Sequence, residues 1–300
     1  DEQFSAYLAE AKAKLSAELP IAAEKKINYG YQYSVKLAEA KLTLNIYNGK
    51  KGLNIVYSGD SALAERAAAL LEGRKAQAAA PATFVTDGLW AGSDESGKGD
   101  FFGSLVVAAV VVDNTTADKL RAAGVKDCKL LTDKKILELE DIIKASVVDY
   151  SVLDVKPRFY NLGYGQVAAQ GGKLNQLLGY GHVAALSKVL EKHEDCHSAL
   201  IDQFTTSMVN IRALKQRFPQ CDVRQQPKAE SNLAVAAASV LARAQFLHTM
   251  AALAVEAGVR ELPKGGGAQA TACARELAAK YGKEALRNYV KLHFANYQRV

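Results

Sequence analysis

Apolar positions in the first 75 residues recur at two different spacings. A helical period predicts an amphipathic helix over residues 2–18, and Ser61 is a suitable N-cap for a second helix over 61–71. Between them, alternating apolar and polar residues predict three strands, with Asn48-Gly49 as the hairpin turn before the third. These strands cover residues 28–37, 41–47 and 53–57. The pattern therefore predicts a small α+β unit of order α-β-β-β-α.

Strand and helix patterns alternate through the rest of the chain. The predicted strands cover residues 89–94, 105–113, 147–155 and 199–204, and the predicted helices cover residues 133–145, 174–191, 230–252 and 271–298. Such alternation favours an α/β layer fold around a mixed sheet. Residues 74–81 (RKAQAAAP) have no apolar stripe and end at a proline, which is typical of a linker. We predict an N-terminal domain at 1–75, a linker at 76–84 and a second domain at 85–300.

Composition places the chain among ordinary globular proteins. Of its 300 residues, 49% are hydrophobic and 23% are charged, which argues against disorder, collagen and coiled coil. The densest apolar run, residues 105–112, is far shorter than the ~20 residues of a membrane-spanning helix. The net charge of +6 permits an anionic partner without requiring one. The four cysteines form no CxxC pair and no export signal is visible, so we expect reduced thiols and a cytoplasmic protein.

Acidic residues occur at places where a buried sheet usually carries apolar ones. Asp94 and Glu95 end a predicted strand and precede Gly97-Lys98-Gly99, Asp202 lies in an apolar strand, and Glu230 precedes the Ala-rich helix. Each has an ordinary explanation: a solvated strand end, a bonded turn, or an acid at a helix N-terminus. Together they can converge on one face of an α/β sheet. Four clustered carboxylates need cations, and their hard oxygens suit Mg²⁺ or Mn²⁺.

Five motifs in order resemble ribonuclease HIII, a bacterial type 2 ribonuclease H, over nearly the whole chain. They are residues 94–103 (DESGKGDFFG), 127–133 (DCKLLTD), 174–178 (LNQLL) with His182, 201–204 (IDQF) and 228–243 (KAESNLAVAAASVLAR). The resemblance implies an RNase H-like catalytic domain preceded by a domain similar to half of a TATA-binding-protein fold. It also implies endonucleolytic cleavage of the RNA strand of an RNA/DNA hybrid, leaving 5′-phosphate and 3′-hydroxyl ends.

The family's acidic set falls on four residues of this chain. Asp94, Glu95, Asp202 and Glu230 are the expected catalytic residues and the ligands of two Mg²⁺ or Mn²⁺ ions. Glu230 and Lys98 favour ribonuclease HIII over ribonuclease HII, which has Asp at the fourth acid and GRG in place of GKG. The chain departs from the family pattern at Cys128, Leu130 and Ser104, where Ser, Lys and Pro are usual; none of these positions is among the four acids.

Substrate contacts are expected from two further places. Backbone groups at Gly97, Lys98 and Gly99 can reach a 2′-hydroxyl, and Lys129 is a candidate for a phosphate contact or simply a solvated lysine. Tyrosines and lysines of the N-terminal domain either grip the duplex or form an ordinary half-buried face with solvated charges. They are Tyr29, Tyr31, Tyr33, Lys36, Lys41, Lys50 and Lys51. The expected partner is an RNA/DNA hybrid, with no membrane and no obligate protein partner, and a monomer is expected.

Three other interpretations compete with this one. Residues 92–98 fit most of a Walker A pattern, but Gly99 replaces the Mg²⁺-binding Ser or Thr and two acids lie in the loop. A non-catalytic hybrid-binding protein has no use for four clustered carboxylates facing a polyanion. His193, Cys196 and His197 could suggest zinc, but they lack a clear fourth ligand and fit a solvated turn.

Overall fold

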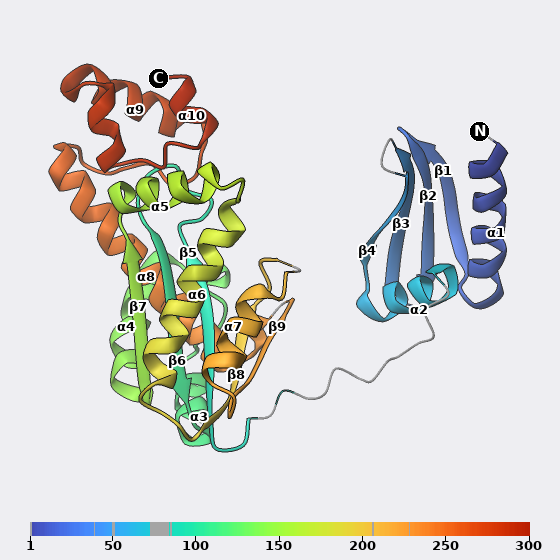
Figure 1. Cartoon of the computed structure of the whole chain (residues 1–300), viewed down its shortest axis with the longest axis horizontal. Coiled ribbons are helices and arrows are strands. Elements are labelled where there is room, and N and C mark those ends of the chain that lie inside the picture. The colour runs from blue at the N-terminus through green and yellow to red at the C-terminus, as the bar shows by residue number, and fades with distance from the viewer. Residues whose placement is uncertain are drawn as a thin grey trace. The chain divides into compact units, whose positions relative to one another are not determined.

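The computed structural model describes residues 2–38, 40–49, 52–72, 84, 86–205, 207–227 and 229–300. Its contacts divide the chain into two units, residues 1–83 and 84–300 (Figure 1). The predicted linker lies outside the described residues except for Phe84. The Phe84 side chain packs against buried residues of the second unit.

The first unit is a four-stranded antiparallel sheet, in the order β1-β2-β3-β4, with two helices. Its elements are α1 (Glu2–Glu18), β1 (Ile21–Ile27), β2 (Gly30–Leu37), β3 (Ala40–Gly49), β4 (Gly52–Gly59) and α2 (Ser61–Glu72). Alternate residues of β2 and β3 are buried with α1 and α2 in one core, because successive side chains of a strand point to opposite faces. The prediction of three strands was wrong by one strand.

The differences from the prediction at β1, at the turn before β2 and at the end of β3 have local explanations. β1 (IAAEKKI) is an edge strand whose middle five residues are exposed, so it carries no alternation. The turn before β2 is Asn28-Tyr29, with Tyr29 at φ 61°, whereas the prediction began a strand at Asn28. Gly49 pairs with Gly52, so Asn48-Gly49 ends β3 and is not the predicted turn. Residues 50–51, between these paired positions, lie outside the described residues.

The second unit is built around a five-stranded mixed sheet, in the order β7-β6-β5-β8-β9. Its strands are β5 (Leu89–Ser96), β6 (Leu105–Val112), β7 (Asp149–Val155), β8 (Cys196–Asp202) and β9 (Asp222–Gln226). β6 runs antiparallel to β5 and β7, whereas β8 runs parallel to β5 and β9. The short 3₁₀ turns are η1 (Cys128–Leu130), η2 (Ala229–Ser231) and η3 (Lys283–Asn288).

Helices cover both faces of this sheet (Figure 1). They are α3 (Asn114–Ala122), α4 (Asp133–Ser146), α5 (Pro157–Ala169), α6 (Leu174–Leu190), α7 (Val209–Arg217), α8 (Leu233–Ala257), α9 (Ala268–Tyr281) and α10 (Ala295–Gln298). β6 is buried along its whole length, and its residues alternate between a core shared with α8 and cores that include α6. Among the described helices, α8 is long and apolar enough to cross a membrane, but 72% of its most apolar window is buried within this unit. α8 is therefore the central core helix.

Close packing of α8 on the sheet depends on one glycine. A Cβ on Gly92 would lie 2.2 Å from the backbone nitrogen of Val235, so no larger residue fits between β5 and the start of α8. This contact sets the beginning of α8, and the residues just before it, against β5. Gly92 thus has a structural role inside a strand, which contradicts the Walker A alternative, because that motif requires residues 92–98 to form a loop.

Candidate active site

Two carboxylates lie at the ends of neighbouring parallel strands. The register pairs Ser93 of β5 with Ile201 of β8, so the next residue on each strand is Asp94 and Asp202 respectively. Residues at the same level of adjacent strands point to the same face. Gly92 and Leu200, two positions earlier, both face the α8 side of the sheet. Asp94 and Asp202 therefore face that side together.

The third carboxylate comes from the turn before α8. Glu230 lies in η2, and the backbone N–H of Ala229 in the same turn donates a hydrogen bond to Oδ1 of Asp202 at 3.1 Å. Asn232 caps α8 by accepting from the N–H of Ala234, and it also accepts from the indole of Trp90 on β5. These bonds tie η2 to both strands, so Asp94, Asp202 and Glu230 gather on one side of the sheet. Lys228, the residue before η2, lies outside the described residues.

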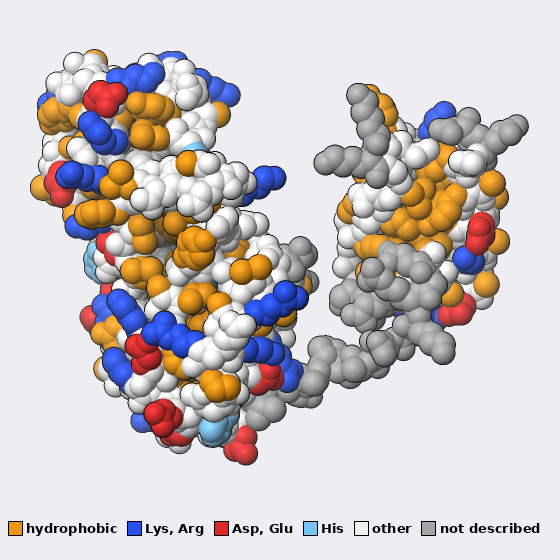
Figure 2. All heavy atoms as spheres, viewed as in Figure 1, with side chains coloured by type: hydrophobic (Ala, Val, Ile, Leu, Met, Phe, Trp, Pro, Cys, Tyr) orange, Lys and Arg blue, Asp and Glu red, His pale blue; other side chains and the backbone are white. Residues whose placement is uncertain are grey.

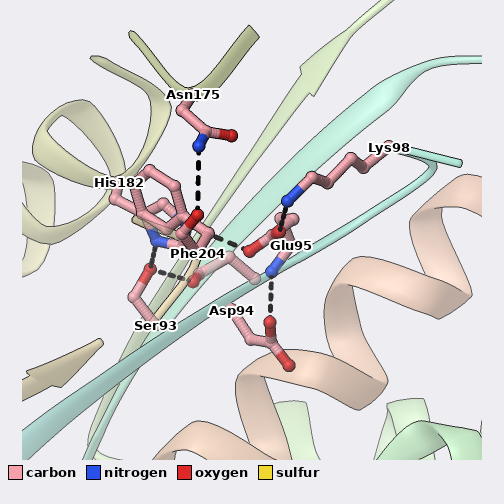
Figure 3. Close-up of polar contacts among 8 residues, drawn as sticks. Ser93, Asp94, Glu95, Lys98, Asn175, His182 and Phe204 are labelled. Atoms are coloured by element: carbon pink, nitrogen blue, oxygen red, sulfur yellow. Dashed lines mark hydrogen bonds and ion pairs between the residues drawn. The ribbon is translucent and has the colours of Figure 1, made fainter. Parts of the chain in front are cut away.

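Glu95 points to the opposite face from Asp94 (Figure 3). Its Oε2 lies 3.1 Å from Nε2 of His182 on α6, and its Oε1 lies 3.7 Å from Nζ of Lys98. His182 is fully buried, and its ring stacks on Phe204 with centroids 4.9 Å apart. The side chain of Glu95 is therefore held by His182 and Lys98 rather than directed at Asp94.

A hydrogen-bond chain fixes the orientation of His182. The Ser93 hydroxyl donates to the carbonyl of Ala108 at 2.8 Å, so it can only accept from Nδ1 of His182, which lies 2.7 Å away. Nδ1 is thus directed at Ser93, and Nε2 faces the Glu95 carboxylate. The amide of Asn175 donates to the carbonyl of Phe204 at 3.2 Å and supports the stacked ring (Figure 3).

The two faces give the adjacent acids opposite electrostatic environments. Burial, the neighbouring Glu95 charge and the Asp202 charge raise the pKa of Asp94 well above its usual value, against a lowering hydrogen bond from the Glu95 N–H. Burial also acts to raise the pKa of Glu95, but the hydrogen bond and charge of His182, with Lys98 and Lys129, lower it overall. Burial and the charges of Glu230 and Glu95 raise the pKa of Asp202. For both Asp94 and Asp202, burial and neighbouring negative charges thus outweigh the groups that stabilise the charged form.

An open cavity of about 470 Å³ brings most of the predicted residues together. Asp94, Glu95 and Asp202 line it, as do the expected substrate-binding residues Gly97, Lys98, Gly99 and Lys129. Partial burial lowers the pKa of Lys129, but the charges of Asp127, Asp94, Asp202 and Glu230 outweigh this and raise it. Lys129 is therefore within electrostatic range of all four predicted acids.

The two glycines of the Gly97-Lys98-Gly99 loop differ in what surrounds them. Gly97 has φ +85°, and a Cβ there would lie 2.1 Å from the carbonyl oxygen of Ser104, so the fold requires glycine. A Cβ on Gly99 would meet nothing within 4 Å. Gly99 is therefore not required for packing, and its backbone is open to a ligand in the cavity.

The carboxylates suit a hard divalent cation. Within the part of the chain that the structure describes, no three His, Cys, Asp or Glu side chains are drawn together into a complete metal-ligand group. Nevertheless, Asp94, Asp202 and Glu230 supply carboxylate oxygens on the α8 side, and a cation would offset the burial and repulsion that raise the pKa of Asp94 and Asp202. The residues present therefore fit Mg²⁺ or Mn²⁺.

In the alternative zinc site, two of the three residues face other groups. Cys196 donates from its Sγ to the carbonyl of Ser198, and the Nε2 of His193 lies 3.3 Å from Asp149.

The tyrosines of the first unit differ in their surroundings. Tyr33 is in the core with Tyr31 half-buried beside it, while Tyr29 is 85% exposed in a turn. Tyr31 and Tyr33 therefore lie on the same face of β2 and pack against this core, whereas Tyr29 precedes the strand and is exposed. Lys50 and Lys51 lie outside the described residues.

The sequence profile of the family described as Ribonuclease HII matches residues 91–297, more than half of the chain. The chain belongs to the ribonuclease HII family. The matched segment contains the four predicted acids, the Gly97-Lys98-Gly99 loop and Lys129, and it corresponds to most of the second unit.

Several proteins that are named ribonuclease HIII are similar to this chain. Ribonuclease HIII of Protochlamydia amoebophila is 37% identical over 203 residues, covering 68% of this chain and 65% of that protein, just under two thirds of its length. Ribonuclease HIII of Chlamydia felis is also 37% identical, over 70% of this chain and 68% of that protein. The crystal structure of Bst-RNase HIII in complex with Mn²⁺ is 28% identical, with a TM-score of 0.65 over 96% of this chain and 94% of that one.

These similarities confirm the expected family, the ribonuclease H class of enzyme and the two-part fold. The structure also brings to the site residues for which the sequence indicated no role. His182 was visible only as part of a motif, and its bonds to Ser93 and Glu95 join positions 89 and 87 residues apart in sequence. Arg243 and Asp133, which form an ion pair at 3.2 Å, also line the cavity. In the sequence, the only local signals for this cluster are a histidine within an apolar helix pattern and a serine within a predicted strand.

Proposed function

We propose that this protein is an endonuclease that hydrolyses the RNA strand of RNA/DNA hybrids and leaves 5′-phosphate and 3′-hydroxyl ends. The observation that carries the proposal is the gathering of Asp94, Asp202 and Glu230, from β5, β8 and η2, on one side of the sheet. The Mn²⁺ complex of Bst-RNase HIII supports a divalent ion as cofactor. A cytoplasmic location and a monomeric state remain part of the proposal.

Asp94, Asp202 and Glu230 would hold two Mg²⁺ or Mn²⁺ ions with their carboxylates. Glu95 completes the set through its backbone carbonyl or through the carboxylate that His182 orients. Two such ions, when bound, lower the pKa of an attacking water and stabilise the departing 3′ oxygen. Because the pKa values of Asp94 and Asp202 are raised, protons compete with a cation for these side chains more strongly than for an ordinary carboxylate.

The Gly97-Lys98-Gly99 loop would select RNA. Gly99 leaves its backbone open beside the cavity, where it can reach a 2′-hydroxyl, the group that distinguishes RNA from DNA. The side chains of Lys98 and Lys129 lie on the cavity wall and supply positive charge for phosphates. Selection by backbone and charge, without base-edge contacts, suits cleavage that is independent of sequence.

The test is cleavage of a labelled RNA/DNA hybrid by the wild type and by Asp202→Asn, with Mg²⁺ and with Mn²⁺. We expect metal-dependent cuts within the RNA strand. Asp202→Asn should lower the rate at least about a thousandfold, because metal ligands supply several kcal/mol of transition-state stabilisation. Hybrid binding by this variant should persist. A fully active Asp202→Asn, or a wild type that binds hybrid without cutting it, would refute the proposal and favour a binding protein.

A further inference from the structure

The loop that carries Gly97-Lys98-Gly99 continues through Asp100, Phe101, Phe102 and Gly103 to β6. One bond within the loop, from the N–H of Asp100 to the carbonyl of Gly97, closes its turn at 3.2 Å. Both phenylalanines are fully buried and contact each other edge to face. The tip with Lys98 and Gly99 therefore depends on how residues 100–103 are anchored.

The C-terminal segment, residues 289–293, anchors this part of the loop. Phe102 and Val290 form an antiparallel bridge. The N–H of Lys291 donates to the carbonyl of Phe101 at 2.8 Å, and the N–H of Gly103 donates to the carbonyl of Tyr289 at 3.0 Å. Residues almost two hundred positions apart thus act as a short two-stranded pair beside the cavity.

The side chain of Lys291 adds two bonds that most lysines do not make. It is fully buried, and Nζ donates to the carbonyls of Asp100 at 2.8 Å and Gly103 at 2.7 Å. These carbonyls flank the Phe101-Phe102 pair. The nearest ring is Tyr160, whose centroid lies 5.5 Å from Nζ. Burial lowers the pKa of Lys291 to about 7, although the charge of Asp100 opposes this.

A buried lysine without a close carboxylate is costly, and an apolar side chain would pack there at less cost. Among the described residues, no ion pair within 4 Å involves Lys291; Tyr160, Tyr164 and His293 form an aromatic cluster beside it. The interactions that offset the cost of burying Lys291 are therefore its hydrogen bonds to the two loop carbonyls. Costly polar groups that break local packing rules are expected at functional positions.

We propose that Lys291 is a positioning residue for RNA recognition: by holding the carbonyls of Asp100 and Gly103, it fixes the angle at which Lys98 and Gly99 face the cavity. This inference rests on the proposed function of that loop. Lys291 touches neither the predicted metal ligands nor the reacting atoms, so it acts only through the loop. Its loss should impair selection of RNA more than it impairs metal binding or the chemical step.

The experiment compares Lys291→Met with the wild type, because Met keeps the length of the side chain and removes the donors. We expect the KM for an RNA/DNA hybrid to rise about tenfold while kcat changes less than about threefold, the pattern of a lost binding interaction. In the cleavage-deficient Asp202→Asn background, the Kd for the hybrid should rise by a similar factor. The Kd for a DNA duplex of the same sequence should rise less, because DNA keeps the phosphates that Lys98 can contact but offers no 2′-hydroxyl to Gly99.

Leu214→Ala is the matched control for lost stability. Leu214 is fully buried on α7, in the core on the opposite face of the sheet from α8. This variant should lower Tm without raising the KM for the hybrid. Lys291→Gln, which keeps one amide donor, should give a smaller rise in KM than Lys291→Met, and it keeps the test available if the Met variant does not fold.

The possible results separate this inference from the proposed function. An unchanged KM for the hybrid in a folded Lys291 variant would overturn it, as would equal weakening for hybrid and DNA duplex. A wild type that neither cleaves nor binds the hybrid would instead remove the proposed function itself.

Discussion

Adjacent residues on one strand, Asp94 and Glu95, have opposite roles because the pleat of β5 turns them to opposite faces. Asp94 joins Asp202 and Glu230 on the α8 side, where burial and repulsion raise its pKa. Glu95 joins His182 and Lys98 on the α6 side, where these partners lower its pKa. The two carboxylates are therefore not interchangeable ligands. At this scale, a divalent ion on the α8 side would offset the burial and the charge repulsion that raise the pKa of Asp94.

The stability of the metal-free protein should depend on Asp94. An acid whose folded-state pKa is raised binds its proton more tightly in the folded than in the unfolded chain. The metal-free protein should therefore lose stability as the pH rises through that raised pKa, and Asp94→Asn should remove this loss. We expect Asp94→Asn to have a higher Tm than the wild type at about pH 7, measured in EDTA.

Divalent ions should reverse this order of stability. Mg²⁺ or Mn²⁺ should raise the Tm of the wild type, because ligands that bind only the folded state stabilise it. Asp94→Asn should show little of this shift and should not cleave. Leu214→Ala is the control here too, since it should start from a lower Tm and keep the full metal-induced shift. An Asp94→Asn variant that is less stable than the wild type in EDTA would contradict the repulsion argument.

At the scale of elements, the site is a meeting of strand ends, one helix start and one loop. The β5–β8 register brings Asp94 beside Asp202, and the close approach of α8 at Gly92 sets η2 and Glu230 against them. The loop after β5 then pairs with the C-terminal segment through backbone hydrogen bonds. Each element contributes one or two of the predicted site residues, so a packing error at Gly92 would displace Glu230, a predicted catalytic carboxylate.

The two glycines of the loop should respond differently to alanine. Gly97→Ala places a Cβ against the Ser104 carbonyl at a positive φ, so we expect a lower Tm and loss of activity. Gly99→Ala places its Cβ in open space, so Tm should stay unchanged while the KM for the hybrid rises about tenfold through obstruction of the ligand. Thermal unfolding and steady-state kinetics of both variants make the comparison. A Gly99→Ala variant with unchanged KM would show that the substrate does not approach this backbone.

At the scale of the whole molecule, the distribution of charge matters more than its sum. The net charge is +6, yet the predicted catalytic centre is acidic, and Lys98 and Lys129 supply positive charge on the wall of the same cavity. On the face of the second unit drawn in Figure 2, Lys and Arg side chains form several separate groups among acidic ones. On this face, the positive charge that a polyanion would meet is therefore divided among several places.

Removal of residues 1–75 should weaken substrate binding. The first unit has its own core, so its loss should leave the core of the second unit intact. We expect the KM for the hybrid to rise about tenfold or more with a smaller change in kcat, because binding contacts made equally in ground and transition states affect KM alone. The salt dependence of binding should also decrease if phosphate contacts are lost. Unchanged affinity would reject a gripping role for this unit.

The sequence predicted the elements with strong periodic patterns. Residues 133–145 and 174–191 match α4 and α6 within one residue at each end, and the apolar run at 105–112 is β6. It missed β1, β9, α3, α5 and α7. β1 and β9 are edge strands with few buried residues, and their structure depends on pairing with a neighbour rather than on their own pattern.

Residue types and motif order determined which chemistry this protein can carry: four acids, a glycine-rich loop with a lysine, and a fold of alternating strands and helices. Only the tertiary structure decided how these groups are divided. The pleat of β5 separates Glu95 from Asp94, His182 reaches Glu95 from a distant helix, and Lys291 holds the loop from the C-terminal segment. The physical reason is that local sequence encodes period and propensity, whereas partners distant along the chain meet only through packing and strand register.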